Sequence, residues 1–106
     1  MARIIQLVDG EPGVTTRVTV GDTSTALPAG LTTLNGKRAK FVTISVEDNE
    51  ARMAVGTNPT QGVGALGHVL YQGDVVELYN PKAIEDIRFI NHVNGEDSVL
   101  QVTAEY

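Results

Sequence analysis

Lys40–Glu47 reads KFVTISVE, and this stretch decides the fold. From Phe41 to Val46 the side chains alternate with a period of two and β-branched residues are frequent, which is typical of a strand with two distinct faces. The closing segment Val99–Tyr106 (VLQVTAEY) alternates in the same way. Shorter stretches of similar character lie between them at Glu50–Gly56, Asp74–Tyr79 and Asp86–Ile90. The chain from Lys40 onward is therefore expected to be a succession of short strands.

Three more strands are expected outside these stretches. Arg3–Val8 is apolar, Val14–Val20 is rich in Val and Thr, and His68–Tyr71 is a short candidate. The total of about eight short strands, with no long helix, predicts an all-β chain. We expect an antiparallel β-sandwich or a small barrel that forms a single domain over residues 1–106. The side chains expected to face inward are Val42, Ile44 and Val46 in one strand, and Leu100, Val102 and Ala104 in another.

Gly, Pro, Asn and Asp mark the connections. Leu27–Gly30 is expected to be a loop, and Asn35-Gly36 favours a type I′ turn because both residues tolerate positive φ. Asp48-Asn49 is expected to be the tight connection of a hairpin. Gly56–Gly67 (GTNPTQGVGALG) is predicted to be a long loop, and Lys82–Glu85 a single helical turn. These signals divide the chain into strands without suggesting a linker between domains.

Composition limits the classes of function. The chain has 106 residues and no Cys, which excludes disulfides and Cys-based metal sites and fits synthesis in a reducing cytoplasm. No apolar run approaches the roughly 20 residues that span a bilayer, so we expect no membrane partner. The net charge of −5 repels polyanions on average, so we expect no nucleic-acid partner. The one basic cluster, Lys37, Arg38 and Lys40, is interpreted as a solvated loop ahead of a strand.

Candidate chemical motifs are weak. Gly62–Gly67 matches G-x-G-x-x-G, but a strand-like segment follows it where a dinucleotide site needs a helix, so we interpret it as a turned loop. His68 and His92 lack a second ligand at metal-binding spacing and are interpreted as structural. The acidic pairs at expected turns are interpreted as solvated charges, with a glycosidase-type carboxylate pair as the alternative. We therefore expect no enzyme activity, no cofactor and no bound metal.

Seven segments carry a resemblance to a known group of proteins. They are Val42–Val46, Glu50–Arg52, Asn58–Thr60, Gly67–Leu70, Gly73–Leu78, Ile84–Ile90 and Leu100–Tyr106. Together they resemble small virion structural proteins of tailed bacteriophages over about two-thirds of the chain. The sequence departs from the pattern of these proteins in two places. Val55 stands where an acidic residue is expected before Gly56, and Val63–Leu66 looks like an insertion.

The resemblance implies a structural role in a virion. The expected function is to decorate or cement the outer capsid surface. The expected partners are the major capsid protein or other virion proteins. The protein is expected to assemble as a homo-oligomer, with a trimer favoured. The protein would be made in the host cytoplasm and located in the virion. A place in the tail or head–tail connector is the first alternative. A sugar-binding β-module is the second alternative. The scarcity of aromatic residues counts against it, since Tyr71, Tyr79 and Tyr106 are the only tyrosines and there is no Trp.

Two segments are the leading candidates for contact with a partner. The apolar N-terminal run, with Ile4, Ile5 and Leu7, could add to the edge of a partner's sheet. The Gly56–Gly67 loop is long for a connection between strands, and long loops of this kind are often functional. Its candidate contact residues are Asn58, Pro59, Thr60 and Gln61. The alternative is that both segments cover the core of this domain itself.

Overall fold

The fold was obtained as a computed structural model, which describes residues 12–106 and contains ten strands and two short helices in that range. The strands are β1 (Pro12–Val20), β2 (Thr25–Ala26), β3 (Thr33–Leu34), β4 (Lys37–Arg38), β5 (Phe41–Asp48), β6 (Ala51–Val55), β7 (His68–Leu70), β8 (Val75–Leu78), β9 (Ile87–Asn91) and β10 (Ser98–Glu105). The helices are α1 (Ala29–Thr32) and α2 (Pro81–Asp86). Neither helix has the length or apolar character needed to cross a bilayer.

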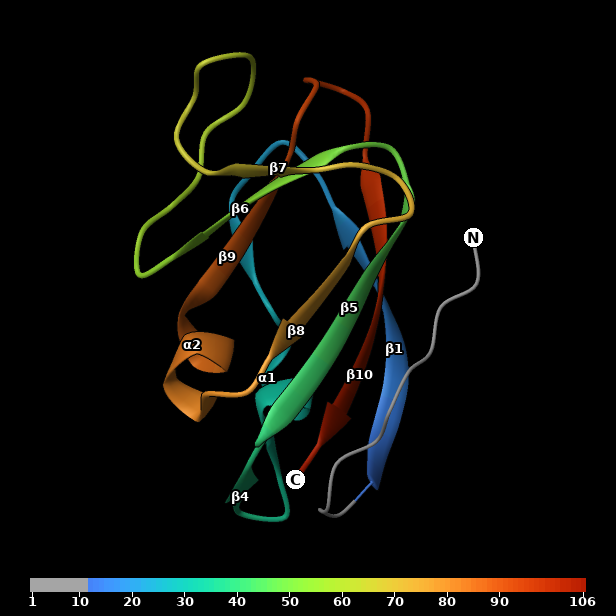
Figure 1. Ribbon diagram of the computed structural model, residues 1–106, viewed down its shortest axis with the longest axis vertical. Helices are drawn as coiled ribbons and strands as arrows, with labels where there is room; N and C mark the ends of the chain where they lie inside the picture. Colours follow the sequence, from blue (N-terminus) through green and yellow to red (C-terminus); the bar gives the residue numbers. More distant parts are fainter. Residues whose placement is uncertain (1–11) are drawn as a thin grey trace.

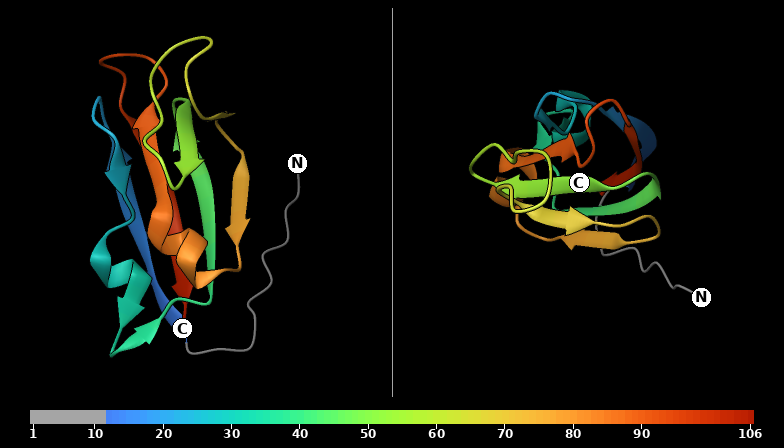
Figure 2. Two further views of the ribbon diagram at one scale, coloured as in Figure 1. Left: turned by 90° about the vertical axis from the view of Figure 1, so that its left-hand side faces the viewer. Right: turned by 90° about the horizontal axis from the view of Figure 1, so that it is seen from above.

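Eight strands form two four-stranded antiparallel sheets that lie face to face (Figures 1 and 2). One sheet has the order β1-β10-β5-β8 and the other the order β2-β9-β6-β7, while β3 and β4 form a separate hairpin. The pairing is nested: β1 pairs with β10, β2 with β9, β5 with β8, and β6 with β7. This is the order of an eight-stranded jelly roll. The expectation of an all-β antiparallel sandwich is therefore confirmed, and the sheets do not close into a barrel.

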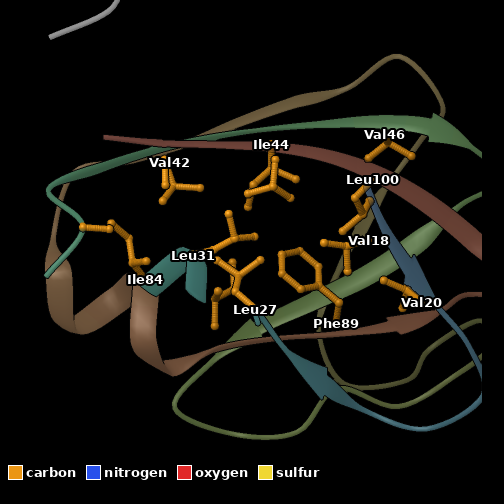
Figure 3. Packing of buried hydrophobic residues seen from close by; sticks show 14 of the residues in the cluster. Val18, Val20, Leu27, Leu31, Val42, Ile44, Val46, Ile84, Phe89 and Leu100 are labelled. Atoms are coloured by element: carbon orange, nitrogen blue, oxygen red, sulfur yellow. The ribbon is translucent and has the colours of Figure 1, made fainter. Parts of the chain in front are cut away.

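The core lies between the two sheets, and β5 and β10 each contribute three residues to it (Figure 3). The inward-facing residues of these strands are at most 2% exposed: Val42, Ile44, Val46, Leu100, Val102 and Ala104. They are cross-strand partners in register, with Ile44 opposite Val102. Phe89 of β9, which is fully buried, packs against them from the opposite sheet. The predicted inward faces of both strands are thus confirmed.

The helices close one end of the sandwich. Leu31 of α1 and Ile84 of α2 point into the core there and are nearly fully buried (Figure 3). The phenol of Tyr106 is also buried, and its hydroxyl lies 3.1 Å from the carbonyl oxygen of Gly30 and 3.0 Å from that of Leu31. Burial raises the pKa of this phenol. The hydroxyl thus provides a donor to carbonyl groups that a short helix leaves without partners.

Three connections differ from the sequence prediction. Leu27–Gly30 is not wholly a loop, because α1 begins at Ala29 and is stabilised by the burial of Leu31. Asp48 is the last residue of β5 and Asn49 forms a bend, but the hairpin prediction is wrong, because β5 and β6 belong to different sheets. The strands β2, β3 and β4 were not expected, since two residues are too few to show periodicity. The last of them includes Lys37 and Arg38 of the supposed basic loop. The Asn35-Gly36 turn is confirmed, with φ of 52° and 77°.

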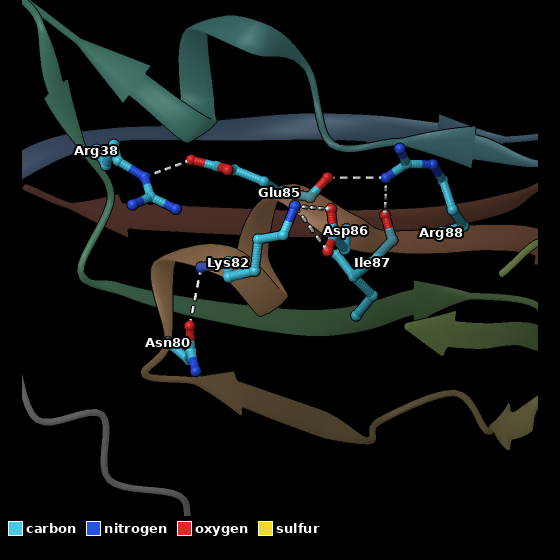
Figure 4. A network of polar contacts seen from close by, with 7 residues as sticks. All are labelled: Arg38, Asn80, Lys82, Glu85, Asp86, Ile87 and Arg88. Carbon is cyan, nitrogen blue, oxygen red and sulfur yellow. Dashed lines mark hydrogen bonds and ion pairs between the residues drawn. The ribbon is translucent and has the colours of Figure 1, made fainter. Parts of the chain in front are cut away.

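The β3–β4 hairpin is tied to α2 by an ion pair (Figure 4). Arg38 Nε lies 2.6 Å from Glu85 Oε2, and this hydrogen bond lowers the pKa of the Glu85 carboxyl below its ordinary value. Asn80 caps the helix, since its Oδ1 accepts a hydrogen bond of 2.9 Å from the backbone N–H of Lys82. The helical turn expected at Lys82–Glu85 is confirmed and is one residue longer at each end.

The buried face of β5 predicts a large effect of truncating Ile44. Ile44→Ala should lower the free energy of unfolding by about 2–5 kcal/mol, because the side chain is fully buried and its removal leaves a cavity. The measurement is chemical denaturation. Ser45→Ala, on the opposite face of the same strand, is the control and should change stability by no more than about 0.5 kcal/mol. Equal effects of the two substitutions would contradict the assigned faces.

Candidate functional site

Three connections gather at the end of the sandwich opposite the helices (Figures 1 and 2). They are the β1–β2 turn (residues 21–24), the long β6–β7 loop (residues 56–67) and the β9–β10 loop (residues 92–97). The expectation of a loop at 56–67 is confirmed, and strand β7 rather than a helix follows the G-x-G-x-x-G segment. This end of the molecule carries the longest stretch of non-regular chain in the described range.

The carboxylate of Asp22 joins all three connections. Its Oδ1 accepts hydrogen bonds from Asn91 Nδ2 at 2.8 Å, from the backbone N–H of Gly95 at 2.8 Å and from Gln61 Nε2 at 3.1 Å. Gln61 also donates to Oδ1 of Asn91, which is fully buried. The hydrogen bonds from Asn91 and Gly95 lower the pKa of Asp22 below its ordinary value of 3.8. The long loop is therefore anchored to its neighbours by one charged group.

Arg52 of β6 holds the second half of the long loop against the outer face of its sheet. Its Nη1 donates to the carbonyl oxygens of Ala65 at 3.0 Å and Gly67 at 2.7 Å. Its Nε donates to Nδ1 of His92 at 3.2 Å. The residue is only 6% exposed, so these acceptors replace the water that a buried guanidinium loses. His92 is thus partly buried and structural, as expected, whereas His68 is exposed.

The loop also approaches the sheet too closely for a side chain at one point. Gly67 has φ of 117°, and a Cβ there would lie 2.9 Å from the carbonyl oxygen of Met53 and 3.0 Å from Cβ of Pro59. Within the loop, the N–H of Thr60 donates to the carbonyl oxygen of Leu66 at 3.0 Å, and the N–H of Leu66 donates to Oγ1 of Thr60 at 2.9 Å. These contacts give the loop a single defined path.

The tip of this anchored loop presents apolar side chains to water. Val63 is 97% exposed and Leu66 is 52% exposed, and Val55, the last residue of β6 before the loop, is 49% exposed. We call these three residues the loop-tip surface. Leu66 and Val55 also line a largely apolar hollow of about 470 Å³ beside β6 and β7. Single exposed apolar residues are common, but here two of the three line one hollow, and the third, Val63, lies on the same well-anchored loop as Leu66. Together they form a surface suited to contact.

The candidate residues of the long loop are brought together, but most of them hold the loop in place. Asn58 Oδ1 accepts a hydrogen bond of 3.0 Å from Ser24 Oγ, Pro59 is buried, and Gln61 is bound to the Asp22 anchor. Their contact with a partner stays a prediction. The exposed side chains of the loop-tip surface were missed, although Val63–Leu66 stood out as an apparent insertion. The N-terminal candidates Ile4, Ile5 and Leu7 lie outside the described residues.

No three His, Asp or Glu side chains of residues 12–106 come together in a way that could hold a metal ion. The chain matches no protein-family model, and comparison with curated proteins and with solved structures found no match.

The contacts of Arg52 predict that the loop depends on its guanidinium. Arg52→Ala should lower the free energy of unfolding by about 2–4 kcal/mol, because buried carbonyl groups lose their donors. Chemical denaturation measures the change. The control is Arg17→Ala, which removes an exposed arginine of β1 and should cost no more than about 0.5 kcal/mol. Similar losses for the two variants would mean that Arg52 does not anchor the loop.

The lowered pKa of Asp22 predicts a pH-dependent contribution to stability. Because folding favours the ionised carboxyl, the contribution is fully present above the ordinary pKa of 3.8 and is lost as the pH falls through the lower folded value. The stability advantage of the wild type over Asp22→Asn should therefore shrink as the pH is lowered below about 4. Urea denaturation at a series of pH values measures it. Asp48→Asn, which neutralises an exposed carboxylate, controls for the loss of charge alone. A pH-independent advantage would refute the anchoring role of the charge.

Proposed function

We propose that this protein is a non-enzymatic structural protein of a tailed-bacteriophage virion, which decorates or cements the outer capsid surface. The observation that carries the proposal is the loop-tip surface, in which an anchored loop holds Val63 and Leu66 in water. A loop that is already ordered loses little conformational entropy on binding. More of the free energy gained by burying its apolar side chains therefore appears as binding affinity. A protein that must occupy many equivalent sites on a shell benefits from such a pre-organised contact.

The sequence resemblance supports the proposed role, and the scaffold is compatible with it. Jelly rolls occur in viral capsid domains, and also in lectin domains and cupins, so the fold is compatible with the proposal without selecting it. The resemblance of Phe41–Ile90 to virion structural proteins comes from segments that the structure places in β5 to β9. The proposal thus combines a scaffold used in capsids with a surface suited to contact.

The proposed partner is the major capsid protein, or another virion protein at the capsid surface. The net charge of −5 favours the outside of the shell over a position that faces packaged DNA. On an icosahedral lattice a homo-trimer around threefold axes is the favoured assembly. Ile4, Ile5 and Leu7 remain candidates for this assembly, and deletion of the first eight residues tests them by the occupancy measurement described below.

A place in the tail or the head–tail connector is the alternative within the virion. The two locations differ in copy number, because a capsid lattice offers hundreds of equivalent sites whereas a tail or neck ring offers few. Quantitative mass spectrometry of intact particles separates them. Hundreds of copies per particle would support a location on the capsid. A copy number that fills only a few rings would instead indicate a location in the tail or neck.

Substitution at the loop tip tests the contact itself. Val63→Asp should leave the thermal stability of the isolated protein unchanged, because the side chain is 97% exposed. It should weaken binding to particles that lack the native protein by about tenfold or more, since a charge would be buried in an apolar contact. Occupancy is measured by co-sedimentation over a range of protein concentrations.

The matched control for this test is Asn35→Asp. It adds the same charge in the exposed β3–β4 turn, at the end of the sandwich remote from the long loop (Figure 1). Its occupancy should equal that of the wild type. Equal occupancy of Val63→Asp and wild type would exclude the loop tip as the capsid contact, and an equal loss for both variants would point to a general effect of charge.

A further inference from the structure

We propose that a hollow between three connections at the loop end is a binding site for a neutral saccharide. The hollow has a volume of about 350 Å³, within the range of about 300–1,000 Å³ typical of small-molecule sites. It is lined by Asn49, Glu50, Tyr71, Gln72, Val93 and Glu96. The β5–β6 and β7–β8 connections that supply four of these residues lie on the other side of the view from the β6–β7 loop (Figure 1). The site therefore uses residues distinct from the loop-tip surface.

Tyr71 supplies an aromatic platform at the mouth of the hollow. The residue is 58% exposed, so much of a large amphipathic ring is left in water. Its backbone is fixed by a tight turn, in which the N–H of Tyr71 donates to Asp74 Oδ2 at 2.8 Å and the N–H of Asp74 donates to the carbonyl oxygen of Tyr71 at 2.9 Å. Gly73 completes the turn with φ of 93°. A sugar ring has a face of C–H groups that can cover such a platform while its hydroxyl groups remain hydrogen-bonded.

The opposite wall is equally well held. Asn49 adopts the left-handed conformation with φ of 57°, and its Nδ2 donates to the carbonyl oxygen of Asp97 at 2.8 Å. Ser98 Oγ donates to the carbonyl oxygen of Asn49 at 3.3 Å. The next residue, Glu50, accepts a backbone hydrogen bond of 3.0 Å from His92. The hollow is therefore formed by connections that are ordered before any ligand arrives, which lowers the cost of binding.

Two polar side chains of the lining are available to a ligand. Gln72 and Glu96 are exposed, and their side chains form no hydrogen bond or ion pair with any residue in the described range. The Gln72 amide can donate and accept, and the Glu96 carboxylate accepts. The Glu50 carboxylate, 3.8 Å from Nε2 of His92, adds a further acceptor. Sugar hydroxyl groups are both donors and acceptors, so this set of groups matches them better than it matches an apolar ligand, which would leave them desolvated.

The charge of the lining selects against anions. Glu50 and Glu96 are acidic, and the lining contains no Lys or Arg. Together with the net charge of −5, this repels phosphates and acidic sugars. A cationic side chain of a partner would also be attracted to the carboxylates, but that attraction weakens with salt, whereas binding of a neutral saccharide does not. Val93, which is 46% exposed, adds an apolar contact that a small cation would not use.

The experiment is a glycan array probed with the purified full-length chain. The array carries neutral oligosaccharides ending in glucose, galactose, mannose or N-acetylglucosamine, together with sialylated forms, and any hit is titrated by isothermal calorimetry at low and high salt. We expect binding to a neutral glycan, with an affinity that does not change with salt concentration. Tyr71→Ala should weaken it by about tenfold or more, while Tyr71→Phe, which retains the ring, should keep most of it. Tyr79→Ala, which removes the other exposed tyrosine, should bind as the wild type does.

Three outcomes would overturn the proposal. The first is the absence of binding to any neutral glycan. The second is binding that Tyr71→Ala leaves intact while its thermal stability is that of the wild type. The third is a preference for sialylated glycans, or binding that falls steeply with salt. None of these outcomes bears on capsid occupancy, because Tyr71→Ala leaves the loop-tip surface unchanged, so the two proposals fail or succeed separately.

Discussion

The position of β10 between β1 and β5 is the constraint on which the rest of the structure depends. Val102 of β10 is opposite Ile44 of β5 on one side and Thr16 of β1 on the other. A slip of one residue in either pairing would turn the buried face of β10 toward water, so the inward side chains specify the register of the sheet. Because β1 is the first and β10 the last described strand, this pairing joins segments from opposite ends of the described range. The sandwich cannot form until these distant segments meet, which is characteristic of slowly folding β-domains.

The nested pairing that follows from this arrangement divides the connections between two ends. At one end α1, α2 and the buried phenol of Tyr106 close the core. At the other end the chain passes repeatedly between sheets through short turns and loops (Figure 1). The helix end is filled by buried apolar side chains and tied by the Arg38–Glu85 ion pair. The loop end is anchored by Asp22 and Arg52, and it exposes both the loop-tip surface and the hollow beside Tyr71. Both proposed binding surfaces thus belong to the loop end of the domain.

Much of the fold could be predicted from local pattern, because β5 and β10 alternate over long stretches and bury the expected residues. The pairing order could not, since partners such as Pro12 and Glu105 lie at opposite ends of the described chain and nothing local connects them. For the same reason Asp48-Asn49 has the composition of a hairpin turn but joins two different sheets. Strands of two residues leave no periodicity to detect.

The position of the long loop was predicted, but the contacts that hold it were not. The glycines and proline of the long loop mark it as an irregular segment, yet its anchors come from contacts between distant residues, such as Asp22 with Asn91. One local signal was available, because Arg52 interrupts an otherwise apolar strand and a buried arginine needs acceptors nearby. The exposure of Val63 and Tyr71 depends on how the loops pack, which only the three-dimensional structure resolves.

The central claim is that this domain binds a capsid through its anchored loop end, and a reconstruction of the intact particle tests it most directly. We expect a jelly-roll domain on the outer surface of the shell, with residues 63–66 against the capsid and the copies arranged around threefold axes. Density for the domain in the tail or neck, or on the shell with these residues turned toward solvent, would contradict it.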